Sequence, residues 1–235
     1  MFSFKKFTVQ QDKCAMKIGT DGVLLGAWCP VDNNPYSVLD IGAGTGILSL
    51  MLAQRSHAEQ IDALEIDEDA YEQCVENFEN SPWSDRLFCF HAGLDEFVDE
   101  PEDEYDLIIS NPPFYSENYK TDDSQRDLAR FQDALPFEEL VEAADLLLSE
   151  NGIFAVIIPY KEEDRFIDLC AQVELFPVKV TRVKGTPTTP IVRSLLAFKR
   201  YELSVLTADE LVIEISRHEY TDEYIDLTKD FYLKM

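Results

Sequence analysis

The sequence predicts a doubly wound α/β fold built on a mostly parallel sheet of seven strands. Apolar runs of strand length alternate with amphipathic helical stretches, which is the pattern of a parallel sheet with helices on both faces. Loop-forming residues fall between these runs, as in Asn80-Ser81-Pro82, and no internal repeat interrupts them. A chain of 235 residues with 46% hydrophobic content can bury the core of one such domain. We therefore expect a single domain over residues 1–235.

Each expected element follows from a local pattern. The strands are assigned to the apolar runs Ser37–Ile41, Ile61–Ile66, Arg86–His91, Tyr105–Ser110, Ile153–Ile158, Val178–Val183 and Ser194–Lys199. Helices are expected between most of them, including Ile47–Arg55, Glu68–Glu79 and Phe137–Leu148. Residues 201–235 are less regular, and their apolar side chains fit either a strand and short helix at the sheet edge or a contact with a partner.

Composition disfavours several classes of protein. No run approaches the roughly 20 apolar residues that span a bilayer, and the first residues do not resemble a secretory signal. The cysteines form an odd set without a Cys-x-x-Cys pair, and the histidines are widely separated. We expect a cytoplasmic monomer with free thiols and no metal site.

The net charge of -26 is unfavourable for binding nucleic acid, but the basic residues are unevenly distributed. Residues 178–200 contain six basic side chains and no acid, and residues 1–17 contain four with one acid. Candidate contacts to RNA in these two basic segments are Lys5, Lys6, Lys179, Arg182, Lys184 and Arg193. The alternative is that the acidic excess provides solubility and the basic segments arise by chance.

The most specific local motif is Asp40-Ile41-Gly42-Ala43-Gly44-Thr45-Gly46, between the first strand and its helix. Glycines let the backbone approach a ligand closely, and a helix start supplies oriented N–H donors. A dinucleotide fingerprint needs Gly-x-Gly-x-x-Gly, whereas here the third glycine comes one position early, which disfavours a nicotinamide cofactor. Asp40, Gly42, Gly44 and Gly46 are therefore candidate cofactor ligands.

A carboxylate at the end of the second strand provides the next candidate. Glu65 can accept hydrogen bonds from both hydroxyls of a ribose. Asp67 is a weaker candidate, because its position also fits the N-cap of the following helix.

The tetrad Asn111-Pro112-Pro113-Phe114 directly follows an apolar strand. Its two prolines make a rigid, extended turn, and their carbonyls have no competing N–H of their own. If the Asn111 side-chain carbonyl and the Pro112 carbonyl each accept one N–H of an aromatic amine, its lone pair is turned toward an electrophile, and Phe114 can stack on the ring. This catalytic group requires alignment rather than a strong base.

Together, these motifs resemble those of seven-stranded, Rossmann-like class I methyltransferases that use S-adenosylmethionine, in which the last strand is antiparallel. The Asn-Pro-Pro-[Phe/Tyr] tetrad is similar to that of enzymes that methylate amino nitrogens of adenine, guanine or a protein glutamine amide. The segment from Met16 to Trp28 resembles the N-terminal segment of the tRNA1(Val) adenine-N6 methyltransferases. These enzymes modify the adenine beside the anticodon. The resemblance extends from Phe4 to about Arg200.

The resemblance implies further site residues. Residues 1–30 would cover the cofactor and substrate site, with Thr20 and Asp21 near the methionine moiety, and Asn111 would also contact the cofactor. Ala92 would lie near the cofactor adenine. One departure is that Phe131 follows Arg130, where the family has Arg-His. Two alternatives remain at this point: a glutamine-amide methyltransferase and a non-catalytic scaffold with the cofactor fold.

Overall fold

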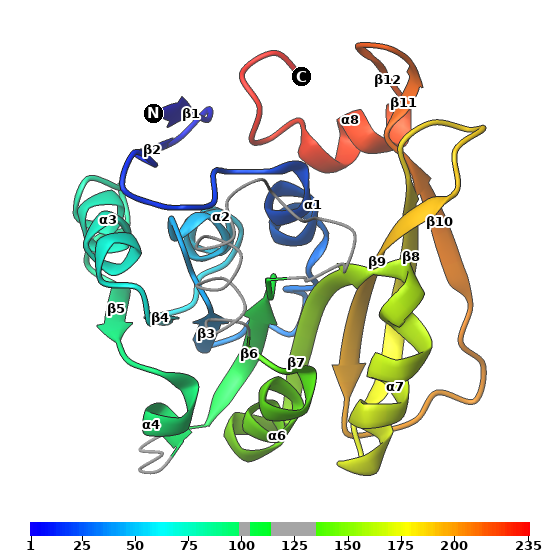
Figure 1. Ribbon diagram of the computed structural model, residues 1–235, viewed down its shortest axis with the longest axis horizontal. Helices are drawn as coiled ribbons and strands as arrows, with labels where there is room; N and C mark the ends of the chain where they lie inside the picture. The colour runs from blue at the N-terminus through cyan, green and yellow to red at the C-terminus, as the bar shows by residue number, and fades with distance from the viewer. Residues whose placement is uncertain (99–103, 114–134) are drawn as a thin grey trace, which may run out of the picture.

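The computed structural model describes residues 1–98, 104–113 and 135–235 (Figure 1). Its central sheet has eight strands in the order β10-β8-β9-β7-β6-β3-β4-β5. They are β3 (Ser37–Ile41), β4 (Gln60–Glu65), β5 (Leu87–His91), β6 (Tyr105–Ser110), β7 (Leu148–Pro159), β8 (Phe176–Lys184), β9 (Ile191–Lys199) and β10 (Ala208–Val212). Strand β9 runs antiparallel to β7 and β8, and the other neighbouring pairs are parallel.

Helices cover both faces of this sheet (Figure 1). They are α1 (Thr20–Trp28), α2 (Ile47–Arg55), α3 (Glu68–Glu79), α4 (Leu94–Val98), α6 (Phe137–Leu147), α7 (Glu163–Gln172) and α8 (Asp222–Thr228), with a 3-10 turn η1 at Tyr160–Glu162. Short pairs β1 (Phe2–Ser3) with β2 (Thr8–Val9) and β11 (Glu214–Ser216) with β12 (Glu219–Tyr220) lie outside the sheet. None of the described helices is long and apolar enough to cross a membrane.

Strand β7 shows why the layers form. Ile153, Ala155 and Ile157 join the apolar core that includes residues of α1, α2 and α3. The intervening Phe154 and Val156 join the core that includes residues of α6 and α7. A strand buried on both faces reads as a continuous apolar run, which is how the sequence presents it.

All seven expected strands are present, and α2 and α3 have the expected bounds. The helix expected over Phe137–Leu148 is α6, which ends at Leu147 because Leu148 already begins the long strand β7. The antiparallel strand is β9, as expected. The assignment of residues 1–235 to one domain remains a prediction.

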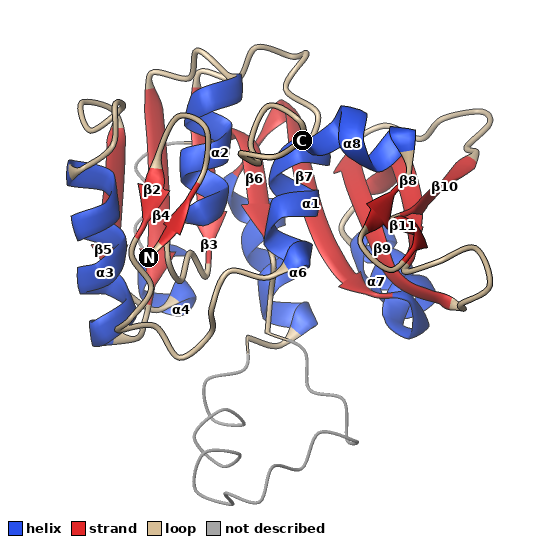
Figure 2. Cartoon of the chain, turned by 90° about the horizontal axis from the view of Figure 1, so that it is seen from above, coloured by secondary structure: helices blue, strands red, loops and turns tan. Residues whose placement is uncertain are grey.

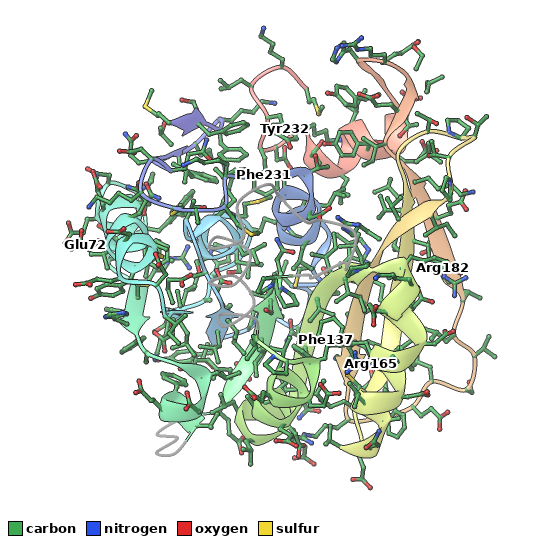
Figure 3. All side chains as sticks on the ribbon, viewed as in Figure 1. Glu72, Phe137, Arg165, Arg182, Phe231 and Tyr232 are labelled. Carbon is green, nitrogen blue, oxygen red and sulfur yellow. The ribbon has the colours of Figure 1, made fainter. Side chains whose placement is uncertain are left out.

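The two chain ends add elements that the seven-strand pattern did not include. Strand β10 pairs in parallel with β8 as an eighth strand, and α8 packs near α1 (Figure 2). Of the two alternatives for residues 201–235, the strand and short helix are therefore present. The termini meet near Phe231 and Tyr232, which Figure 3 labels. The Lys5 amide donates to the Phe231 carbonyl at 2.8 Å, and the Phe4 and Tyr232 ring centroids are 6.0 Å apart.

Candidate active site

The two sequence motifs follow neighbouring strands at the same edge of the sheet. Ile41, the last residue of β3, pairs with Ser110, the last residue of β6, and the Ser110 hydroxyl donates to the Ile41 carbonyl at 2.8 Å. The strand order reverses here, because β4 and β5 lie on one side of β3 while β6 and β7 lie on the other. In open α/β sheets, ligands bind outside the carboxyl ends of the strands at such a point.

The glycine loop, residues 42–46, presents an open face at two positions. Gly42 and Gly44 have φ values of +75° and +55°, and a Cβ at either position would meet no atom within 4 Å. The amides of Gly42 and Ala43 donate to the Leu64 carbonyl at 3.0 and 2.9 Å, so these donors are already engaged. The loop therefore gives a ligand space to approach its backbone closely, whereas the N–H groups of Gly42 and Ala43 are not free to bind it.

Gly46 is constrained by its packing against α3. Its φ is +75°, but a Cβ there would lie 2.5 Å from the Phe78 ring and 2.8 Å from the Cys74 sulfur of α3. The residue is buried, so the absence of a side chain is needed for packing of the loop on α3. The expected contact of Gly46 with a cofactor stays a prediction.

Asp40 lies beneath the loop and has no exposed surface. One carboxylate oxygen accepts from the Ser49 amide at 3.1 Å and from the Ser49 hydroxyl at 2.8 Å, which ties the start of α2 to β3. The other oxygen is buried without a partner among the described residues. Burial raises the pKa of Asp40 to about 7, against the effect of the Ser49 hydrogen bonds.

Glu65 ends β4 beside the loop, as a ribose ligand should. Its carboxylate accepts from the Gly44 amide at 2.7 Å and from the Asp67 amide at 2.9 Å. The side chain of Asp67 accepts from the Ala70 amide at 2.8 Å, so its capping role is confirmed. The carboxylate of Glu65 thus lies next to the open face over Gly44.

A hollow of about 370 Å³ adjoins Glu65 at the carboxyl ends of β4 and β5. It is lined by Ile66, His91, Ala92, Gly93, Asp95 and Glu96. Ile66 is 60% exposed, which is unusual for isoleucine, and the His91 ring stacks on Tyr71 with centroids 5.1 Å apart. The prediction for Ala92 falls in this hollow. Ile66 was not among the candidate site residues predicted from the sequence, although an apolar residue directly after Glu65 was visible there.

Together these features suit a nucleoside-containing cofactor. The open glycines lie beside a carboxylate, and the hollow next to that carboxylate has an exposed apolar wall. Among the residues that the structure describes, no group of three or more His, Cys, Asp or Glu side chains could hold a metal ion.

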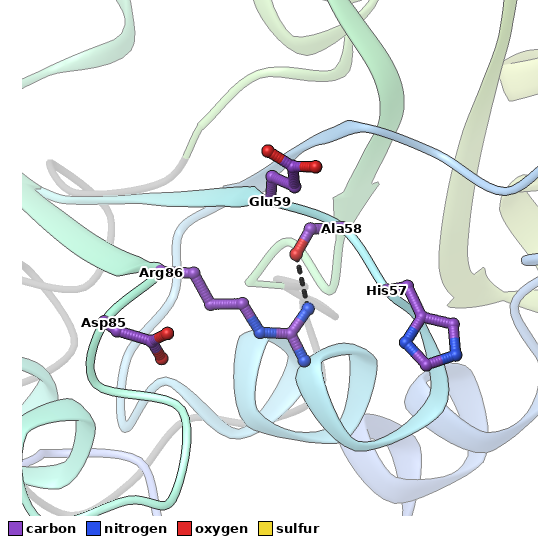
Figure 4. Close-up of a pocket in the computed structure, with 5 residues that line it drawn as sticks. All are labelled: His57, Ala58, Glu59, Asp85 and Arg86. Carbon is purple, nitrogen blue, oxygen red and sulfur yellow. Dashed lines mark hydrogen bonds between the residues drawn. The ribbon is translucent and has the colours of Figure 1, made fainter.

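A second hollow lies at the opposite, amino ends of β4 and β5 (Figure 4). It is lined by His57, Ala58, Glu59, Asp85 and Arg86. The Arg86 guanidinium donates to the Ala58 carbonyl and, at 2.6 Å, to the Ala53 carbonyl of α2. Arg86 therefore satisfies carbonyls at the end of α2, and this hollow lies away from both motifs.

Helix α1 lies next to the tetrad. A Cβ on Gly22 would lie 3.5 Å from Ile47 and 4.0 Å from the Asn111 side-chain nitrogen. Pro112 is buried, while Asn111 and Pro113 are half-buried. Phe114, Arg130 and Phe131 lie outside the described residues.

Thr20 and Asp21 form the first turn of α1, near this same edge. The Asp21 carboxylate accepts from Arg193 of β9 at 2.8 Å. This ion pair holds α1 against the sheet. The expected proximity of Thr20 and Asp21 to a methionine moiety stays a prediction.

Most cations of the two basic segments are engaged within the protein. Arg182 lies beside the start of α7 (Figure 3). It binds Glu163 at 2.6 Å, and Lys184 binds Glu210 at 2.8 Å. Lys179 lies 4.4 Å from the Trp28 ring centroid and burial lowers the pKa of its ammonium.

At the other basic segment, Lys5 donates to carbonyls of Lys229 and Met235. Lys6 is exposed and makes no hydrogen bond or ion pair with the described residues. In the part of the chain that the structure describes, these cations are therefore mostly held by internal contacts. The interpretation of these residues as contacts to RNA stays a prediction.

Comparison with known proteins agrees with this geometry. Residues 29–165, more than half of the chain, match the family model described as the Methyltransferase small domain. A tRNA1(Val) (adenine(37)-N6)-methyltransferase of Flavobacterium johnsoniae is 77% identical over 235 residues, with 100% of both chains covered. A relative of the same name from Bacteroides fragilis is 46% identical, covering 100% of this chain and 98% of its own.

A solved structure shows the same fold. The crystal structure of a predicted O-methyltransferase from Agrobacterium tumefaciens has a TM-score of 0.70 and 19% identity, covering 90% of this chain and 96% of its own. From the glycine loop and tetrad at one sheet edge, the family match and the full-length relatives, the chain belongs to the tRNA1(Val) (adenine(37)-N6)-methyltransferase family.

Proposed function

We propose that the protein methylates the N6 amino group of adenine 37 in tRNA1(Val), with S-adenosylmethionine as the methyl donor. The proposal rests on the pairing of Ile41 with Ser110. The glycine loop follows Ile41 and the tetrad follows Ser110, so the two motifs start side by side. Neighbouring strands are about 4.8 Å apart, so ligands held by the two motifs are within reach of each other. The substrate comes from the names of the relatives.

The residues of the chain divide into two groups in this proposal. Gly42 and Gly44 admit the cofactor, Glu65 binds its ribose hydroxyls, and Ile66 forms the apolar wall for its adenine. S-adenosylmethionine supplies an electrophilic methyl group when it is bound.

The tetrad would act on the substrate. The Asn111 side-chain carbonyl and the Pro112 carbonyl each accept one N–H of the target amine, which turns the nitrogen lone pair toward the crevice. The Asn111 nitrogen lies on the side of Gly22, which leaves the carbonyl oxygen on the other side of the amide. With S-adenosylmethionine bound, its methyl carbon would pass from sulfur to N6, and the N6 proton would leave to solvent. A location in the cytoplasm, with tRNA as partner, belongs to this proposal.

Mass spectrometry of nucleosides tests the substrate. Purified protein and S-adenosylmethionine should convert one adenosine of a tRNA1(Val) transcript to N6-methyladenosine. A transcript with guanosine at position 37 is the matched control and should stay unmodified. Methyl transfer to a protein glutamine amide instead of the transcript would replace this proposal with the glutamine-amide alternative.

A further inference from the structure

Asn77, in the last turn of α3, connects two parts of the chain that are far apart in the sequence. Its side-chain oxygen accepts from the Gln10 amide at 2.7 Å. Its side-chain nitrogen donates to the Gln10 carbonyl and to the Thr45 carbonyl, both at 2.9 Å. The residue is 1% exposed, and its hydrogen bond to Thr45 is buried, whereas the two to Gln10 are partly buried. One buried amide thus binds a peptide group of the N-terminal segment and the backbone of the glycine loop.

The glycine loop depends on this side of α3 for its shape. Thr45 lies between Gly44, with its open face, and Gly46, which packs against Cys74 and Phe78 of α3. The hydrogen bond from Asn77 to the Thr45 carbonyl therefore holds the loop at the residue next to the proposed cofactor contact.

The N-terminal segment, residues 10–19, leads from Asn77 to the carboxyl edge of the sheet. The Lys13 amide donates to the Gln73 side chain at 3.2 Å, one turn closer to the start of α3. Cys14 follows, and burial together with the charge of Glu65 raises the pKa of its thiol to about 11. The segment then enters α1, whose Gly22 faces Asn111. The segment therefore connects α3 with the helix next to the tetrad.

We propose that Asn77 is a positioning residue for cofactor binding, which links the placement of residues 10–19 to the shape of the glycine loop. The inference rests on the proposed cofactor site. An amide is the side chain that can accept from the Gln10 N–H and donate to two carbonyls at once. Because coupling between two parts of a protein is reciprocal, a ligand that orders the loop also orders the segment through Asn77.

Gln73 provides a matched control on the same helix. It is fully buried and binds the same N-terminal segment through Lys13, but no described hydrogen bond joins it to the glycine loop. Gln73→Ala therefore loosens the segment alone, whereas Asn77→Ala releases the segment and the loop. Asn77→Asp keeps the acceptor for the Gln10 amide and removes both donors.

The experiment combines isothermal titration with S-adenosylmethionine and amide hydrogen exchange. We expect Asn77→Ala to weaken cofactor binding about tenfold, Asn77→Asp nearly as much, and Gln73→Ala less than about threefold. Saturating cofactor should slow exchange of residues 10–18 in the wild type and in Gln73→Ala, but not in Asn77→Ala.

Two results would overturn the inference. One is a lower melting temperature of Asn77→Ala with unchanged cofactor affinity, which would make Asn77 a structural residue only. The other is cofactor-induced protection of residues 10–18 in Asn77→Ala equal to that of the wild type. Failure of the wild type itself to bind S-adenosylmethionine would instead contradict the proposed function.

Discussion

The glycine loop and the basic strands β8 and β9 show how differently two sequence patterns translate into structure. The loop keeps in three dimensions the arrangement that its sequence indicates, with Gly42 and Gly44 open at the end of β3. Three cations of β8 and β9 instead pair with acids from other segments: Arg182 with Glu163, Lys184 with Glu210 and Arg193 with Asp21. A backbone motif is local, whereas the field around a charge depends on every neighbour that folding brings to it.

The largest expected effect is at the substrate side of the crevice. Asn111→Ala removes an acceptor that the proposal assigns to the transition state, so methyl transfer to tRNA should fall on the order of a thousandfold. Cofactor affinity should change little. Single-turnover rates and isothermal titration measure the two quantities, and a turnover within tenfold of the wild type would refute the role of Asn111.

The second prediction concerns the buried carboxylate below the loop, which has only neutral partners. The pKa of Asp40 is raised to about 7 in the folded protein, so the folded state holds its proton where the unfolded state has lost it. The stability that the folded protein gains from holding this proton is fully present below about pH 4 and is lost as the pH rises to about 7.

Asp40→Asn removes this pH dependence and keeps an acceptor for Ser49. Between pH 4 and pH 8, the free energy of unfolding of the wild type should therefore fall by on the order of 4 kcal/mol more than that of the variant. Urea unfolding of both proteins at the two pH values measures this difference. Parallel pH profiles of the two proteins would contradict the raised pKa.

The third prediction separates two glycines within the loop. Gly44→Ala places a methyl group in open space, so it should weaken cofactor binding by more than about tenfold with only about 1 kcal/mol lost to the positive φ. Gly46→Ala forces a methyl group against Phe78 and Cys74 and should cost about 3 kcal/mol of stability. Thermal unfolding and titration with S-adenosylmethionine distinguish them. Equal effects of both variants on both measurements would remove the distinction between contact and packing.

The smallest expected effects are in the basic strands. Arg182→Gln leaves the buried Glu163 without its cation and should cost about 2 kcal/mol, less than a fully buried pair because Arg182 is 37% exposed. It should leave the salt dependence of tRNA affinity unchanged, since its charge is already neutralised.

Lys184→Gln breaks a more exposed pair and should cost about 0.5 kcal/mol. Lys6→Gln is the control for an exposed cation. Filter binding across a range of salt concentrations measures the slopes, and a shallower slope for Arg182→Gln than for Lys6→Gln would restore β8 as an RNA contact.

The sequence by itself determined the order of the strands along the chain, the position of the glycine loop and the tetrad, and the cap at Asp67. These features depend on periodicity and backbone preferences within a few residues, so no distant contact was needed to foresee them. The apolar runs of β3, β6 and β7 were recognisable because both faces of each strand are buried.

Only the tertiary structure decided that Gly46 packs while Gly44 stays open, that Asp40 is buried, and that Asn77 joins Gln10 to Thr45. It also decided that β10 extends the sheet and that Arg182 and Lys184 pair with carboxylates. Each of these outcomes depends on groups separated by tens of residues or more in the sequence. Burial and pairing of a side chain are properties of the packed neighbours, and a linear pattern does not specify which neighbours those are.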